Sequence, residues 1–174
     1  MLTYILIAED HPICAEAIKL AAQNHDSAIF VEMCDRLAEA EAMLRKRDYR
    51  LLVLDLGLKD SRGLINLTVI RKNFPKLPVL IISGQENPDI PVQARDLGAM
   101  GFLNKSASLD EIRDAIAAVL DGMTHFDIRK EEQSSSPAVF SNLSKAQLRV
   151  MRELASGRSN KIIAYELGLS EPTV

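Results

Sequence analysis

Residues 51–60, LLVLDLGLKD, contain the stretch that decides the fold: four apolar residues followed directly by Asp55. A second apolar run, Val79–Ile82, ends in the same way before Ser83. Runs that are apolar at every position are typical of parallel strands whose two faces are both covered. We therefore expect a parallel sheet between layers of helices, with polar groups at the carboxyl ends of its strands.

Apolar runs and amphipathic segments alternate on both sides of this stretch. Strands are expected at Tyr4–Ala8, Ala28–Met33, Leu51–Leu54, Val79–Ile82 and Gly101–Leu103, and helices at Pro12–Asn24, Arg36–Arg47, Gly63–Asn73, Pro88–Leu97 and Leu109–Leu120. Two helix starts carry capping signals, Asn87-Pro88 and the capping box of Ser108 and Glu111. Five β-α units in succession predict a doubly wound α/β domain, a flavodoxin-like (βα)5 fold with right-handed crossovers.

Composition changes after residue 122 and indicates two domains. Residues 1–122 carry 14 Lys and Arg against 18 Asp and Glu, whereas residues 141–174 carry 5 against 3. Between them, a polar segment with a serine run supplies the expected linker, 123–141. A small basic unit over 142–174 is compatible with nucleic-acid contact, although a net charge of +2 is weak evidence alone.

The chain of 174 residues is 47% hydrophobic and 26% charged, as in ordinary globular proteins. No apolar run approaches the roughly 18 residues of a membrane span, and the first residues show no signal-peptide pattern. Cys14 and Cys34 match no metal or redox spacing. We therefore expect a cytoplasmic protein with free thiols and no membrane partner.

Polar residues follow four of the expected strands. They are Glu9 and Asp10 after the first, Asp55 after the third, Ser83 after the fourth and Lys105 after the fifth. In a doubly wound sheet these four strands are neighbours, and their carboxyl ends meet where ligands bind. Each residue alone has an ordinary explanation as a cap, a turn residue or a solvated lysine. Together they predict one site.

The chemistry of this set favours phosphoryl transfer to a carboxylate. Three neighbouring carboxylates repel one another, and Mg²⁺, which prefers oxygen ligands, relieves the repulsion. One carboxylate can then attack a phosphoryl donor and form an acyl phosphate. The ammonium of Lys105 and the hydroxyl of Ser83 are suited to stabilising the transferred group.

With these strand-end residues, positions 4–121 resemble the receiver domains of two-component response regulators, in particular of the NarL/FixJ family. The resemblance implies that a sensor histidine kinase phosphorylates Asp55, and that the protein is no enzyme beyond self-phosphorylation and autodephosphorylation. The other roles that it implies are Mg²⁺ binding by Glu9, Asp10, Asp55 and the main-chain carbonyl of Gly57, pairing of Lys105 with the phosphoryl group, and a switch formed by Ser83 and Phe102.

Two positions differ from common receiver patterns, and Phe102 has its own consequence for the switch. Lys59 stands where many receivers have proline, so we expect a more mobile loop and a more positive local field. Glu9 stands where aspartate is commoner, and its longer side chain is expected to reach the metal through a water molecule. Phe102 lacks the hydroxyl of tyrosine, so burial alone would decide its inward state.

Residues 142–174 show the pattern of a helix-turn-helix. Ala164, Gly168 and Val174 stand at the offsets of a close helix contact, a left-handed turn and an apolar anchor. The segment resembles the LuxR-type helix-turn-helix, which implies that the complete chain binds DNA and can form a homodimer. The residues expected to contact DNA are Arg158, Lys161 and Thr173.

The printed sequence ends at Val174, about one turn into the expected recognition helix. We therefore expect the helix-turn-helix to be truncated in this chain, and the chain as written to bind DNA poorly. The function predicted is a transcription regulator switched by phosphorylation. One alternative is a receiver that acts through a protein partner. Another is an aspartate-nucleophile phosphatase, although those enzymes carry D-x-D after their first strand and Asp55 is followed by Leu56 and Gly57.

Overall fold

The computed structural model describes residues 2–85 and 87–126. The strands are β1 (Thr3–Ala8), β2 (Ile29–Cys34), β3 (Leu51–Leu54), β4 (Val79–Ser83), β5 (Gly101–Asn104) and β6 (His125–Phe126). The helices are α1 (Pro12–His25), α2 (Leu37–Lys46), α3 (Ile65–Asn73), α4 (Asp89–Asp96) and α5 (Leu109–Leu120). All ten expected elements are present in the expected order. The predicted helix-turn-helix, with Arg158, Lys161 and Thr173, lies outside the described residues.

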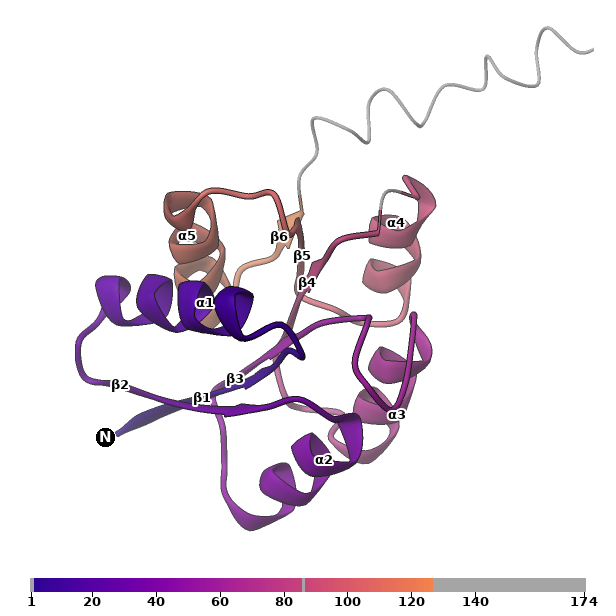
Figure 1. The fold of residues 1–174 in the computed structure, drawn as a ribbon, viewed down its shortest axis with the longest axis horizontal. Helices are drawn as coiled ribbons and strands as arrows, with labels where there is room; N and C mark the ends of the chain where they lie inside the picture. The colour runs from indigo at the N-terminus through magenta and orange to yellow at the C-terminus, as the bar shows by residue number, and fades with distance from the viewer. Residues whose placement is uncertain (1, 86, 127–174) are drawn as a thin grey trace, which may run out of the picture. The chain divides into compact units, whose positions relative to one another are not determined.

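The strands form one parallel sheet in the order β2-β1-β3-β4-β5-β6. Helices α1 and α5 cover one face of it, and α2, α3 and α4 cover the other (Figure 1). Successive β3 residues belong to opposite cores: Leu52 and Leu54 to the α2–α4 side, Leu51 and Val53 to the α1–α5 side. This explains why the run is apolar at every position and confirms the flavodoxin-like fold.

The sixth strand was not predicted. β6 pairs in parallel with β5, where His125 aligns with Gly101 and Phe126 with Phe102. The sheet therefore continues past residue 122, into the segment that we expected to be linker. A Cβ atom on Gly101 would lie 2.7 Å from the carbonyl oxygen of His125, so the glycine permits the close approach of β6. A strand of two residues is too short to show a hydrophobic period.

The capping box at the start of α5 is confirmed, whereas α4 begins at Asp89 with Pro88 as its N-cap, one residue later than predicted. Ser108 Oγ accepts a hydrogen bond from the Glu111 amide, and the Glu111 carboxylate accepts one from the Ser108 amide. The side chain of Asn87 accepts a hydrogen bond from the amide of Asp89 at 3.0 Å. Both cysteines are free thiols. Among the helices of the described residues, none is long and apolar enough to cross a membrane.

Candidate functional site

Main-chain hydrogen bonds fix the first residue after each central strand. The bonds run from the Glu9 amide to the Cys34 carbonyl (3.0 Å), from the Asp55 amide to the Ala8 carbonyl (2.9 Å), and from the Lys105 amide to the Ser83 carbonyl (3.0 Å). Each bond continues the ladder of a parallel strand pair by one step. The strand ends therefore bring the predicted residues to one edge of the sheet in defined positions.

Lys105 links two buried carboxylates at this edge. Its Nζ atom donates hydrogen bonds to Asp55 Oδ2 and to Glu9 Oε1, each at 2.8 Å. The side chains of Glu9 and Asp55 are 1% and 3% exposed. Burial by itself would lower the pKa of Lys105, but the hydrogen bonds to both carboxylates outweigh it and raise the pKa above its usual value. The ammonium therefore stays charged beside Asp55.

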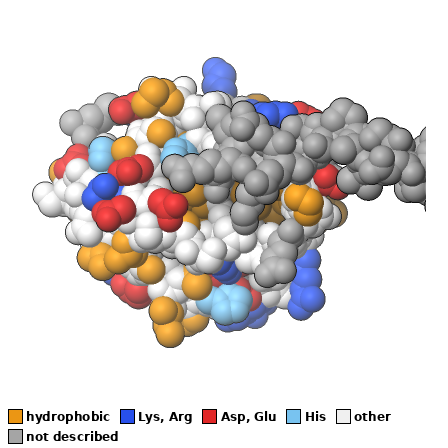
Figure 2. All heavy atoms as spheres, turned by 90° about the horizontal axis from the view of Figure 1, so that it is seen from above, with side chains coloured by type: hydrophobic (Ala, Val, Ile, Leu, Met, Phe, Trp, Pro, Cys, Tyr) orange, Lys and Arg blue, Asp and Glu red, His pale blue; other side chains and the backbone are white. Residues whose placement is uncertain are grey.

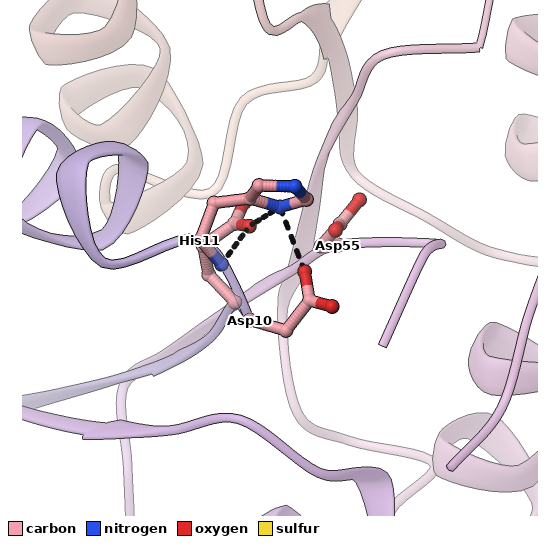
Figure 3. A group of neighbouring side chains, drawn as sticks. Asp10, His11 and Asp55 are labelled. Carbon is pink, nitrogen blue, oxygen red and sulfur yellow. Dashed lines mark hydrogen bonds and ion pairs between the residues drawn. The ribbon is translucent and has the colours of Figure 1, made fainter. Parts of the chain in front are cut away.

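Four side chains form a compact group of possible metal ligands. Glu9, Asp10, His11 and Asp55 each place a ligand atom within 4.8 Å of the others. Figure 3 shows Asp10, His11 and Asp55 converging from two strand ends, and in Figure 2 acidic side chains gather on part of one face beside basic and histidine side chains. The structure therefore brings together the three carboxylates that the sequence predicted at this site.

Two oxygens of this group are buried without a hydrogen-bond partner among the described residues, Glu9 Oε2 and Asp10 Oδ1. A carboxylate oxygen that is removed from water and left unpaired costs free energy unless a cation or a donor compensates it. Oxygen donors are also the ligands that Mg²⁺ requires. The residues present therefore fit a hard divalent cation.

Gly57 lies against the Asp55 carboxylate. A Cβ atom on Gly57 would be 3.4 Å from Asp55 Oδ2, so the main chain passes close to the predicted acceptor. A larger residue would press on the carboxylate. This position agrees with the expectation that the Gly57 carbonyl serves the same cation, which remains a prediction.

The two residues of the predicted switch are buried on the neighbouring strands. Ser83 is 1% exposed, and its Oγ accepts a hydrogen bond from the Gln85 amide at 3.3 Å. Phe102 is 5% exposed and belongs to the same core as Ile90 and Ala94 of α4. The aromatic ring thus already lies inward in this structure, beside the helix that follows the Ser83 strand.

Asn66, in α3, was not predicted and supports the acceptor from behind. It is fully buried, and its Nδ2 donates a hydrogen bond to the main-chain carbonyl of Asp55 at 3.2 Å. The amide oxygen of Asn66 has no partner among the described residues. The sequence signal that could have identified Asn66 is a polar residue on the buried face of a predicted amphipathic helix.

The β3–α3 loop, which contains Lys59, is also tied to α2. Lys59 contacts the Asp35 carboxylate, so its charge is paired there. Asp60 accepts hydrogen bonds from the amides of Leu37 (2.7 Å) and Ala38 (3.0 Å) at the start of α2. Side chains therefore connect the loop that lacks proline to α2 and to Asp35, and its greater mobility remains a prediction.

Comparisons with known protein families agree with the two domains that the sequence predicted. Residues 5–117 match the model of the response regulator receiver domain, and residues 141–174 match that of the luxR family of bacterial regulatory proteins. The receiver match alone covers more than half of the chain. The two matches follow the order expected from the sequence.

Individual relatives share both regions. The chain is 32% identical to the glycerol metabolism activator of Pseudomonas putida, over 98% of this chain and 83% of that protein. It is 29% identical to the nitrate/nitrite response regulator NarP of Escherichia coli, over 98% and 82%. RcsB of Salmonella enterica serovar Typhimurium, solved bound to the rprA promoter with a phosphomimetic, has a similar fold, with a TM-score of 0.73 at 24% identity over 98% and 86%.

These matches exceed what a shared fold alone produces, because a receiver model and a luxR-type model occur in one chain together with relatives aligned along nearly its whole length. The predicted family is confirmed, and with it the role of a regulator of transcription; action through a protein partner in place of DNA is not favoured. The chain belongs to the NarL/FixJ family of response regulators.

Proposed function

We propose that this regulator is switched by phosphorylation of Asp55, with a sensor histidine kinase as donor. The observation that carries the proposal is the buried Asp55 carboxylate, held 2.8 Å from the Lys105 ammonium at the edge of an acidic cluster. A structural aspartate needs no such arrangement. A phosphoryl acceptor needs a fixed nucleophile, a countercharge and a place for a divalent cation.

The contacts assign separate tasks to the two oxygens of Asp55. Because Lys105 donates to Oδ2, we assign Oδ1 as the atom that attacks phosphorus. The new O–P bond forms as the N–P bond of the kinase phosphohistidine breaks, and the imidazole leaves with the bonding electron pair. The main-chain bonds of Asp55 to Ala8 and Asn66 hold the carboxylate still during this transfer.

The acidic cluster supplies the cation site that this transfer needs. When bound, Mg²⁺ would be held by Asp10, Asp55 and the Gly57 carbonyl, with Glu9 through a water molecule, and would neutralise charge on the transferred group. Glu9 is already engaged on one side, since its Oε1 accepts from Lys105. Its second oxygen, Oε2, is the one without a partner among the described residues.

The switch follows from rearranged hydrogen bonds. The phosphoryl group adds roughly 1.5 to 2 negative charges near neutral pH, to which Lys105 and the Ser83 hydroxyl can donate. Ser83 Oγ now accepts from the Gln85 amide, so a turn of the hydroxyl toward the phosphoryl oxygens disturbs the start of the β4–α4 loop. Phe102 packs against α4 on the same side of the sheet. The turn of the Ser83 hydroxyl and a movement of Phe102 would therefore both shift the position of α4.

We further propose that the complete protein acts as a homodimer on DNA through its luxR-type region. The support is the match over residues 141–174 and the relation to RcsB, which has been solved as dimers on DNA. Arg158, Lys161 and Thr173 remain the predicted DNA contacts.

The decisive experiment is incubation of the full chain with acetyl phosphate and Mg²⁺, followed by intact-mass analysis. We expect the wild type to gain one phosphoryl group, Asp55→Asn to gain none, and a chelator to abolish the reaction. Asp60→Asn is the matched control, because Asp60 is an acid of the same loop that binds α2 instead of the cluster. Labelling of both Asp55 proteins, or of neither, would contradict the assignment. Repeated turnover of a small phosphomonoester would instead indicate an enzyme.

A further inference from the structure

His11 belongs to the acidic cluster by position, yet the phosphorylation mechanism gives it no task. It follows Asp10 directly and precedes the first residue of α1. Its Nδ1 atom lies 2.8 Å from Asp10 Oδ1 and 3.0 Å from Glu9 Oε1 (Figure 3). The imidazole side chain is 66% exposed, so it forms the outer wall of the cluster.

The contact between His11 and Asp10 is not a directed hydrogen bond. Asp10 Oδ1 has no hydrogen-bond partner among the described residues although Nδ1 is only 2.8 Å away. Two donor atoms that bind the same metal as neighbours show this separation, because cis ligands about 2.1 Å from an octahedral ion lie about 3.0 Å apart. The spacing of Nδ1 to Asp10 Oδ1 therefore matches one edge of a coordination shell, whereas the contact of Nδ1 with Glu9 Oε1 at 3.0 Å is a hydrogen bond.

The unpaired oxygen of Glu9 is a separate observation that points to the same conclusion. Glu9 is buried, and its Oε2 is the second oxygen of the group without a hydrogen-bond partner among the described residues. Lys105 does not fill this role, because its Nζ binds Glu9 Oε1 and Asp55 Oδ2 and stands 3.4 Å from His11 Nδ1. A cation between the carboxylates and the imidazole would compensate both oxygens.

We propose that His11 is a nitrogen ligand of the divalent cation, through Nδ1, and that the site therefore favours Mn²⁺ and Co²⁺ over Mg²⁺. The proposal rests on the cation site of the proposed function and names its preferred metals. Mg²⁺ keeps to oxygen ligands and gains little from an imidazole, whereas first-row transition metals bind imidazole together with carboxylates.

The direct test is the spectrum of Mn²⁺ bound to the untagged full chain. Electron spin-echo envelope modulation detects nitrogen bonded to Mn²⁺, and we expect ¹⁴N modulation in the wild type. Labelling the histidines with ¹⁵N should replace it by the ¹⁵N pattern. His25 and His125 are the other histidines, so the double variant His25→Gln/His125→Gln should keep the signal and His11→Gln should lose it.

Binding affinities give a second readout. From the free Mn²⁺ signal and competition by Mg²⁺, we expect His11→Gln to weaken Mn²⁺ and Co²⁺ binding about tenfold and Mg²⁺ binding less than about twofold. His25→Gln, at the far end of α1, should change neither.

The possible failures are distinct. Bound Mn²⁺ without ¹⁴N modulation, or modulation that persists in His11→Gln, would overturn the role of His11 and leave the cation site standing. A wild type that binds no divalent cation would overturn this proposal together with the cation site of the proposed function.

Discussion

The β3–α3 and β4–α4 loops leave the same edge of the sheet, but their hydrogen bonds differ in reach. In the β3–α3 loop, Asp60 binds the start of α2 and Lys59 pairs with Asp35, both more than twenty positions away in the sequence. In the described part of the β4–α4 loop, the side-chain bonds join residues two positions apart, as from Gln85 to Ser83.

This difference separates a fixed part of the site from a responsive one. A nucleophile is effective when its surroundings hold it in place before the reaction, which the bonds around Asp55 achieve. A switch requires an element whose two arrangements differ by little free energy, and local bonds are easily exchanged. We therefore expect a rigid acceptor loop and a second loop that responds to phosphorylation.

Asn66→Ala tests the rigid side most severely. The substitution removes the donor to the Asp55 carbonyl from a fully buried position and leaves a small cavity. We expect a loss of about 3 kcal/mol in the free energy of unfolding, measured by urea denaturation of the full chain. Asn73→Ala, on the exposed end of the same helix, should cost less than about 0.5 kcal/mol. Equal losses of stability in the two variants would contradict a supporting role of Asn66 for Asp55.

Lys105→Met should cost about 2 kcal/mol in metal-free buffer near neutral pH, because Glu9 and Asp55 lose their shared countercharge. The pKa of Lys105 is raised in the folded state, so its stabilising contribution is complete below the ordinary lysine pKa and disappears as the pH rises through the folded value. Urea denaturation at a series of increasing alkaline pH values should therefore show that the difference in the free energy of unfolding between wild type and variant decreases.

The burial of Cys34 raises its thiol pKa to about 12 and also reduces stability at high pH, but equally in both proteins. The difference between them therefore isolates Lys105. A difference in the free energy of unfolding that stays constant up to the highest pH would contradict the proposed ion pairing.

Asp60→Ala should cost about 1 kcal/mol, the usual value of a helix cap, because the first amides of α2 lose their acceptor. Hydrogen exchange should become faster at Leu37 and Ala38 and in the β3–α3 loop. Asn87→Ala is the matched control, since Asn87 accepts from the Asp89 amide and its effect should stay at the start of α4. If Asn87→Ala also loosens α2, the contrast between the loops does not hold.

Lys59→Ala should have the smallest effect, below about 0.5 kcal/mol at physiological ionic strength. The pair with Asp35 is solvent-exposed, and such pairs contribute little. The rate of phosphorylation by acetyl phosphate should also stay the same, because Asp60 still holds the loop. A several-fold change in that rate would instead confirm the expectation that the charge of Lys59 acts on Asp55.

The sequence predicted those parts of the site that depend on strand ends. The apolar run before Asp55 set the bounds of β3 correctly, and parallel pairing then placed Glu9, Asp55 and Lys105 together. This works because the carboxyl ends of neighbouring parallel strands always meet at one edge. The five helices followed from their apolar periods, and α5 also from its capping box.

The supporting contacts could not be predicted in the same way. Asp60 reaches α2 and Asn66 reaches the Asp55 carbonyl only because of how the helices pack on the sheet. His11 carried a signal in its position beside two acids, yet the direction of its ring depends on the local backbone. The ion pair of Lys59 could not be predicted either, because its partner, Asp35, follows a strand that is distant in sequence.

The two-residue strand β6 connects β5, the strand of Phe102, directly to the last described residues of the chain. Phe126 is the register partner of Phe102, and it is the last described residue before the chain continues toward the luxR-type region. We therefore expect a shift of β5 at Phe102 to reach Phe126 across one step of the main-chain ladder. The last residues that the structure describes are in this sense part of the sheet.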